Sequence, residues 1–132
     1  MHVFGWCSIG REEWRWMQFL LLVYHDEKWW MSLSDALRAA VYEDYRTFVE
    51  KITNSGAYRE GGELELSSTA CTVRIRNGST ETCQVSYNPA REQLGGFFLI
   101  DANVLDDAIA IAAQIPAAHG GSIEVRAVLG GS

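Results

Sequence analysis

The chain has 132 residues, 48% of them hydrophobic, with a net charge of −6 and a pI near 5.0. This length suits one domain with its own core and is too short for two domains of ordinary size. The acidic balance argues against nucleic-acid binding, which depends on clustered Lys and Arg. The longest apolar run, from Phe19 to Tyr24, is far shorter than the ~20 residues that span a bilayer. We therefore expect no nucleic-acid partner and no membrane span.

Residues 1–16 look unlike the rest of the chain. They mix three tryptophans with glycines and charges, and show no clear period, whereas Met17 directly precedes a strand pattern. We expect an N-terminal extension at 1–16 and a single domain at 17–132, so truncation before Met17 should leave the fold and the soluble dimer intact. In the alternative, Trp6, Trp14 and Trp16 pack as an extra edge element. The N-terminus lacks the features of a secretory signal, so a cytoplasmic location is expected.

The first half of the domain begins with a strand and continues into a helix. Residues 18–24 are apolar and partly β-branched, which predicts a strand buried on both faces. A serine- and aspartate-rich start at 32–35 and a stop at 54–56 then delimit a helix. Its apolar residues recur at helical spacing: Leu37, Val41, Tyr45, Phe48 and Ile52.

A hairpin is predicted around Asn77-Gly78, the strongest short hairpin signal, within a region of alternating residues at 62–87. A two-residue turn pairs Arg76 with Ser79 and places Arg74 opposite Glu81 as a cross-strand ion pair. The same register puts Cys71 and Cys83 on opposite faces, which argues against a disulfide between them. The chain has three cysteines, an odd number, and we expect buried or half-buried free thiols.

The last third contains a strand, a helix and a final strand. Asn88-Pro89 ends the hairpin, and Gly95-Gly96 precede a central strand at 97–100, where they allow a bend or a close approach. Like Gly61-Gly62, they are interpreted as turn glycines. Asn103 is expected to cap a helix that ends at Pro116, and a turn at 119–121 leads to a strand over 123–129. The inner stripe of this helix is predicted to be Leu105, Ala108, Ile109 and Ala112.

The resulting order is β-α-β-β-β-α-β. A ferredoxin-like split β-α-β sandwich of the α+β class, with an inserted hairpin strand, satisfies the connection rules most simply. The two helices cover one sheet face and leave the other bare. A face that carries Phe97, Leu99 and their neighbours seldom meets water alone, so we expect a homodimer.

Several segments in order resemble one known family. The segments are Leu-Leu-Val-Tyr-His-Asp-Glu at 21–27, Thr-Val-Arg-Ile-Arg-Asn-Gly at 72–78, Gln-Leu-Gly-Gly-Phe at 93–97, Leu-Ile-Asp at 99–101, Leu-Asp-Asp-Ala-Ile at 105–109, Ile-Pro-Ala-Ala at 115–118 and Ile-Glu-Val-Arg at 123–126. Together they are similar to the YCII-related proteins of the DGPF type, over about Met17 to Leu129. The resemblance implies a dimeric ferredoxin-like α/β barrel.

The chain departs from this family at its signature motif. Where the family carries Asp-Gly-Pro-Phe, this chain reads Gln84-Val85-Ser86-Tyr87. The substitution of glutamine for aspartate removes a proton-transfer group and keeps hydrogen bonding. Some YCII-like proteins are thought to use a His-Asp pair, and one member is a dehydrochlorinase acting on a chlorinated hydroxyquinol. Most members resemble proteins of unknown function, often encoded beside extracytoplasmic-function sigma factors.

Several candidate ligand-site residues also have a purely structural interpretation. His25 follows the first strand, where pocket residues gather, or is a solvent-facing loop histidine. Tyr45 lies on the inner helix face, where a core residue is commoner than a catalytic one. Arg91 and Glu92 hold an anionic ligand or form a surface pair. Tyr87 is expected to line a cavity, with its ring packed and its hydroxyl pointing at a ligand. The full set is His25, Tyr45, Arg74, Gln84, Tyr87, Arg91 and Glu92.

Other polar residues are interpreted as structural or solvated. Asp26 and Glu27 are adjacent carboxylates that point apart, and His119 precedes two turn glycines. No Cys-x-x-Cys pair, His-Glu-x-x-His helix or phosphate-binding glycine loop is present, so no metal or cofactor is expected.

Two functional classes follow. The first is a dimeric small-molecule binding domain, or a regulatory partner linked to a sigma factor, without strong catalytic activity. The second is an acid-base enzyme, lyase or dehydrochlorinase-like, that acts on a small aromatic or carbonyl compound. We favour the first class because the motif aspartate is absent.

Overall fold

The computed structural model describes residues 17–83 and 90–130. The expected extension at 1–16 lies outside these ranges, as does the break at Asn88-Pro89. The elements in chain order are β1 (Met17–Asp26), α1 (Glu27–Ser32), α2 (Asp35–Asn54), β2 (Tyr58–Glu63), η3 (Ser67–Thr69), β3 (Thr72–Arg76), β4 (Ser79–Cys83), β5 (Glu92–Ala102), α3 (Leu105–Ala112), η4 (Pro116–His119) and β6 (Ser122–Ala127).

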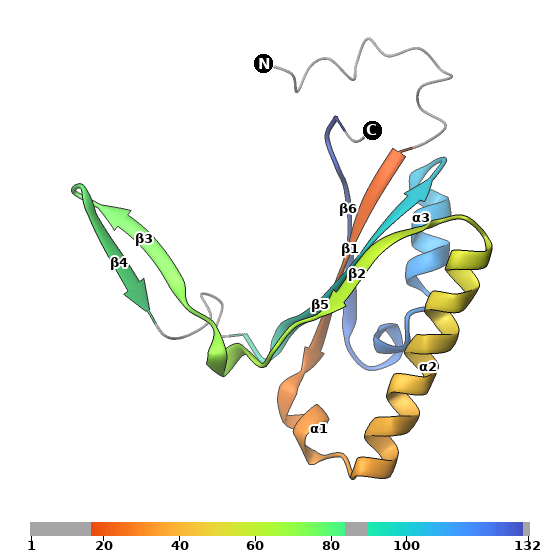
Figure 1. Ribbon diagram of the computed structural model, residues 1–132, viewed down its shortest axis with the longest axis horizontal. Helices are drawn as coiled ribbons and strands as arrows, with labels where there is room; N and C mark the ends of the chain where they lie inside the picture. The colour runs from red at the N-terminus through yellow and green to blue at the C-terminus, as the bar shows by residue number, and fades with distance from the viewer. Residues whose placement is uncertain (1–16, 84–89, 131–132) are drawn as a thin grey trace.

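A four-stranded antiparallel sheet in the order β2-β5-β1-β6 is the centre of the fold (Figure 1). With α2 after β1 and α3 after β5, the central elements run β-α-β-β-α-β. This arrangement confirms the expected α+β class and is consistent with a ferredoxin-like fold. The inserted hairpin, β3 with β4, forms a separate two-stranded sheet.

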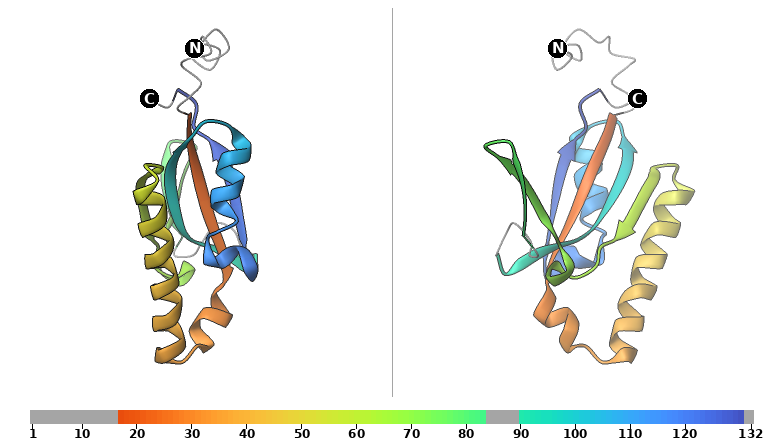
Figure 2. Two further views of the ribbon diagram at one scale, coloured as in Figure 1. Left: turned by 90° about the vertical axis from the view of Figure 1, so that its right-hand side faces the viewer. Right: turned by 60° about the vertical axis from the view of Figure 1, so that its left-hand side comes forward.

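Both long helices lie on the same face of the sheet (Figure 2). Alternate residues of β1 and β5 point toward them, so that Phe19, Leu21 and Ile100 are almost completely buried. The residues between them, including Leu20 and Leu22, are only half-buried. Within the single chain, the first strand is therefore buried on one face and half-buried on the other, because α2 and α3 cover one face only.

The predicted helix at 35–54 is confirmed as α2. Ser34 caps it, since its hydroxyl accepts a hydrogen bond from the backbone N–H of Leu37 at 3.2 Å. Toward the C-terminus, Phe48 and Ile52 are buried, and the Phe48 ring meets Phe98 edge-on at 5.2 Å. Leu37, expected on the inner face, is 57% exposed.

The second long helix, α3, differs from the expectation at its start. Its N-cap position is Val104 and no side chain caps it, so Asn103 does not have the expected role. Ala108 and Ala112 are buried as predicted, whereas Leu105 and Ile109 are about half exposed. Small residues at the contact let α3 lie close to β5 and β6.

The glycine pairs lie in strands and not in turns, which corrects the sequence interpretation. Gly61 and Gly62 belong to β2, a strand that sequence reasoning missed, and Gly95 and Gly96 belong to β5. A β-carbon on Gly96 would lie 2.9 Å from the carbonyl oxygen of Gly62. The expected close approach at Gly95-Gly96 is thus confirmed, and it is the neighbouring strand that approaches.

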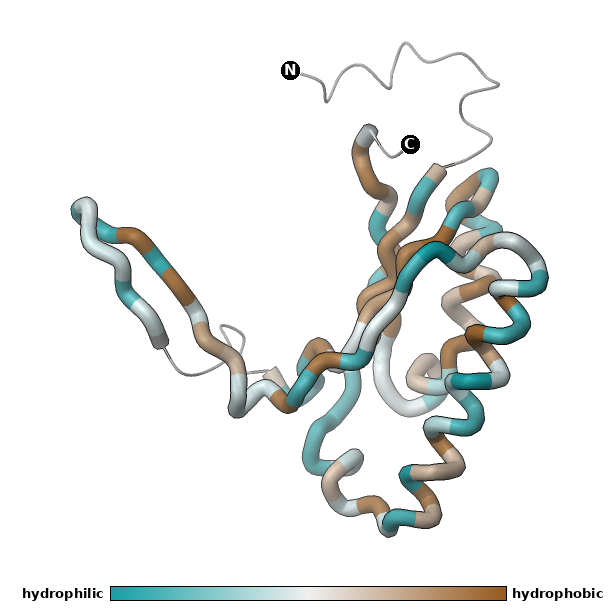
Figure 3. Tube along the Cα trace, viewed as in Figure 1, coloured by the Kyte–Doolittle hydropathy of each residue, from teal (hydrophilic) through white to brown (hydrophobic). Residues whose placement is uncertain are grey.

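The β3–β4 hairpin projects away from the sheet on the side opposite the long helices (Figure 1). Its predicted register is confirmed, with Arg76 opposite Ser79 and Arg74 opposite Glu81. Apolar segments along β3 stand out in Figure 3, and its Val73 and Ile75 are 59% and 66% exposed. Cys71 is a free thiol, but it is exposed, contrary to expectation. The side chain of Cys83 and the whole of Cys7 lie outside the described part.

Substitution of Ile100 by alanine tests the position of the core. Ile100 is fully buried in β5, so Ile100→Ala should lower the free energy of unfolding by about 2–5 kcal/mol. The matched change Ile109→Ala, on the half-exposed side of α3, should alter it by less than about 0.5 kcal/mol. Urea denaturation of both variants measures the difference. Equal losses would place the core elsewhere.

Candidate ligand-binding site

A cavity of about 830 Å³ lies between the helices and the sheet. Its volume falls within the range of about 300–1,000 Å³ common for small-molecule sites. The walls come from β1, α1, α2, β2, β5 and η4, and from the residues next to them. The lining includes His25, Asp26, Trp29, Trp30, Tyr42, Asp44, Tyr45, Tyr58, Glu63, Arg91, Gly95, Phe97, Phe98 and His119.

His25 reaches the cavity from the end of β1. The pairing of β1 with β5 shifts register between Val23 and Tyr24, opposite the Gly95-Gly96 pair. A side chain at Gly95 would collide with the His25 imidazole, so the glycine provides the space that the ring occupies. The His25 ring also meets the Trp30 ring edge-on, at a centroid distance of 6.2 Å.

The short helix α1 closes one end of the cavity and depends on Asp26. One carboxylate oxygen of Asp26 accepts a hydrogen bond from the backbone N–H of Lys28 at 2.9 Å and caps the helix. The other accepts from the Arg91 Nε, also at 2.9 Å. The Arg91 hydrogen bond is the main reason that the pKa of Asp26 lies below its ordinary value. Asp26 is therefore a structural part of the site.

An aromatic wall stands next to α1. The Trp30 ring meets Tyr42 edge-on at 5.4 Å with an interplanar angle of 87°. The Arg38 guanidinium lies 5.4 Å from the centroid of the Trp30 ring and also donates to the carbonyl oxygens of residues 30 and 33. The Tyr42 hydroxyl donates to both carboxylate oxygens of Glu63, at 2.8 and 3.1 Å. These contacts fix the wall to α2 on one side and to β2 on the other.

Tyr45 forms the part of the wall nearest the core. Its ring stacks on Phe98 at 6.3 Å with an interplanar angle of 16°. Burial raises the pKa of Tyr45, so its hydroxyl is neutral and can donate or accept a hydrogen bond in the cavity. Tyr45 therefore packs against the core, as the helical pattern predicted, and also lines the cavity.

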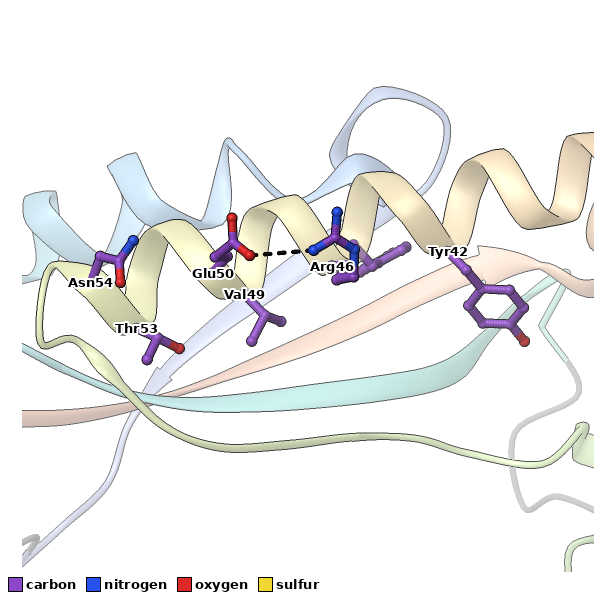
Figure 4. Close-up of a pocket in the computed structure, with 7 residues that line it drawn as sticks. Tyr42, Arg46, Val49, Glu50, Thr53 and Asn54 are labelled. Atoms are coloured by element: carbon purple, nitrogen blue, oxygen red, sulfur yellow. Dashed lines mark hydrogen bonds and ion pairs between the residues drawn. The ribbon is translucent and has the colours of Figure 1, made fainter.

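A shallower groove of about 480 Å³ runs along α2 outside this cavity. Figure 4 shows Tyr42, Val49 and Thr53 pointing from α2 toward β2, while Arg46 and Glu50 pair along the helix. Tyr42, Tyr45 and Val49 line both the groove and the cavity. These side chains thus lie between the groove and the cavity.

The cavity brings together three of the seven sequence-predicted residues: His25, Tyr45 and Arg91. Glu92 does not line it and instead accepts a hydrogen bond from the Ser122 hydroxyl at 2.8 Å. Arg74 lies in the projecting hairpin, away from the cavity. Gln84 and Tyr87 lie outside the described residues. Arg91 and Glu92 thus bond to different partners and form no joint anion site.

Sequence reasoning missed several lining residues. Asp26 was interpreted as solvated, although an aspartate directly before a helix is a common N-cap. His119 was interpreted as structural, yet it lines the same cavity as His25, far away in sequence. The aromatic pair Trp29-Trp30 carried no periodic signal, because α1 has only six residues.

Neither a metal site nor a membrane span emerges from the described residues. Across 17–83 and 90–130, no cluster of three or more His, Cys, Asp or Glu side chains could bind a metal ion. Within the same ranges, none of the helices combines the length and the apolar character that crossing a bilayer requires.

The Asp26–Arg91 pair predicts a pH-dependent effect of Asp26→Asn. Asparagine is also a good N-cap, so the substitution retains the cap of α1 and removes only the charge on Asp26. Because the folded-state pKa of Asp26 is lowered, its ionised form stabilises the fold at neutral pH, and that stabilisation is lost as the pH falls below about 4 through the folded pKa. The wild-type advantage over Asp26→Asn should therefore shrink in acid. Urea unfolding at several pH values measures it, and a difference that is constant with pH would contradict the pair.

Comparison with known proteins identifies the family of the chain. The family model of the YCII-related domain matches residues 17–130. An uncharacterised protein of Rhizobium meliloti (strain 1021) is 30% identical over 112 residues, which cover 83% of this chain and 90% of that protein. The match to the family model spans every element from β1 to β6. The chain belongs to the YCII-related domain family.

Proposed function

We propose that this protein is a small-molecule binding domain that acts as a homodimer and has no strong catalytic activity. The observation that carries the proposal is the cavity of about 830 Å³, whose walls are aromatic rings on a rigid base of β1 and β5. Trp29, Trp30 and Tyr42 supply flat apolar surface, which favours a flat, aromatic ligand.

The polar groups of the cavity support binding more than proton transfer. Asp26 is bonded to Arg91 and to the backbone of α1, and Glu63 accepts both hydrogen bonds from Tyr42. These bonds hold the walls in place, so the cavity keeps its shape without a ligand. A preorganised cavity of this kind loses little entropy when a ligand binds.

An acid-base enzyme for a small aromatic or carbonyl compound is the second candidate. One observation favours it: His25 and His119 line the same cavity, and histidine is the commonest general acid or base at neutral pH. Chemical change of a bound compound, abolished in His25→Gln with binding retained, would move the assignment to this class. A sigma-factor-linked regulatory partner remains a prediction that neither candidate requires.

The bare face of the sheet supports the homodimer. Leu20, Leu22, Phe97 and Leu99 alternate with the core residues and point away from the helices. Two pairs of charged side chains lie on the same face, Glu124 with Arg126 at 3.2 Å and Arg59 with Asp101. A largely apolar surface of this kind can pack against a second copy of itself across a two-fold axis. Closure of two such faces would form the dimeric barrel.

Ligand binding is tested through Trp29, which lines the cavity and is 50% exposed. We expect a thermal-shift screen with small phenols, quinols and carboxylates to identify a ligand that stabilises the protein by about 2.7 kcal/mol at one hundred times its dissociation constant. Trp29→Ala should weaken that ligand, because it removes a wall, whereas Trp29→Phe should retain most of the affinity. A hit unaffected by either change would place the ligand elsewhere, and a screen without hits would contradict the binding function.

The dimer is tested by a charge at the centre of the bare face. Leu22 lies opposite Phe97 on one side and Glu124 on the other, so Leu22→Arg should prevent association. Light scattering should then give the mass of a single chain, 14.8 kDa, with an unchanged circular dichroism spectrum. Leu37→Arg, on the exposed start of α2, is the control and should remain dimeric. A monomeric wild-type protein, or a dimeric Leu22→Arg variant, would refute this interface.

A further inference from the structure

We propose that the cavity selects a positively charged aromatic compound, a flat ring that carries a protonated amine, over neutral and anionic compounds of the same shape. This inference rests on the proposed binding function and adds the chemical class of the ligand. It differs from the expectation of an anionic ligand at Arg91 and Glu92, which stays a prediction.

The charge of the lining side chains is the first reason. Among the described residues that line the cavity, three carry carboxylates, Asp26, Asp44 and Glu63, and one carries a guanidinium, Arg91. Arg91 already forms an ion pair with Asp26 at 2.9 Å. Asp26 offsets the charge of this cation, and an anionic ligand would be repelled by Asp26 and by two further carboxylates.

Glu63 acts directly on the aromatic wall. Burial raises the pKa of both Tyr42 and Tyr45, and the negative charge of Glu63 raises it further in each case. The field of this carboxylate therefore reaches both phenol rings in the cavity. The same field attracts a cation in the cavity near Tyr42, while the Arg38 guanidinium acts on that ring in the opposite sense. Since Glu63 is exposed, we expect this attraction to weaken with added salt.

The aromatic rings are the second, independent reason. Cations bind the faces of Trp and Tyr rings through the negative potential of the π system, and cages of such rings recognise amines. Trp30 and Tyr42 stand nearly perpendicular at 5.4 Å and form one corner of such a cage. The Arg38 guanidinium lies 5.4 Å from the Trp30 centroid, so this ring accepts a cation, and the Asp35 carboxylate 3.6 Å from Arg38 offsets that charge. The wall thus suits an ammonium group near Glu63 as well as a flat ring.

Three compounds with one ring system test the proposal. Tryptamine carries a protonated amine, 3-ethylindole is neutral, and indole-3-propionate is an anion. Isothermal titration calorimetry of the full-length protein should show that tryptamine binds about tenfold or more tightly than either of the other two, a modest electrostatic preference. Its affinity should fall as the salt concentration rises from about 20 to about 300 mM, because the Debye length shrinks over that range from roughly 20 Å to roughly 6 Å.

The matched variants locate the effect. Glu63→Gln keeps an acceptor for the Tyr42 hydroxyl and removes the charge, so the preference for tryptamine should fall several-fold, as it should in Asp44→Asn. Glu81→Gln, in the projecting hairpin, removes a charge far from the cavity and should leave the preference unchanged. Equal loss in Glu81→Gln would mean that only the net charge of the protein matters and would overturn the proposal.

The outcomes separate this inference from the function on which it rests. Binding of indole-3-propionate or 3-ethylindole as tightly as tryptamine would overturn the cation preference and leave the binding function standing. No binding by any of the three, together with a silent aromatic screen, would overturn the binding function and the preference with it.

Discussion

Residues of β1 pair with β5 along the whole length of β1, from Met17 opposite Ala102 to Asp26 opposite Glu92. The alternation along this pairing sends Phe19 and its neighbours toward the helices and Leu20 toward the bare face. The single register shift in the pair lies beside the glycines of β5. Beyond that shift, His25 packs against Gly95 and the floor of the cavity begins. Sheet, core and cavity all depend on this one pairing.

A sheet covered on one side gives the chain two surfaces with different uses. The cavity lies on the helix side and the proposed dimer interface on the opposite face, and Phe97 contributes to both. The base of the hairpin is hydrogen-bonded to α1. Glu27 of α1 accepts hydrogen bonds from the backbone N–H and hydroxyl of Ser67, at 2.7 and 2.6 Å. This contact joins the wall of the cavity to the base of the projecting β3–β4 arm.

Periodic segments and turn chemistry predicted the fold well, and the site only in part. The helix capped by Ser34 and the hairpin at Asn77-Gly78 follow local rules, so the sequence alone located both. The strand β2 was missed because its glycines carry no apolar alternation, and they are there to let β5 approach. His25 and His119 share a cavity only through the tertiary fold, which no spacing in the sequence reveals. The Asp26–Arg91 pair also forms only through the tertiary fold, because the two residues are far apart in sequence.

The central claim is that the space between the helices and the sheet is a ligand site for aromatic amines. Titration of isotope-labelled protein with tryptamine, followed by two-dimensional NMR, tests it most directly. The account predicts that amide signals of Trp30, Tyr42 and Glu63 shift progressively, while those of Val73 and Ile75 in the hairpin do not. Shifts confined to the hairpin or to the bare face around Leu20, or no shifts at all, would contradict it.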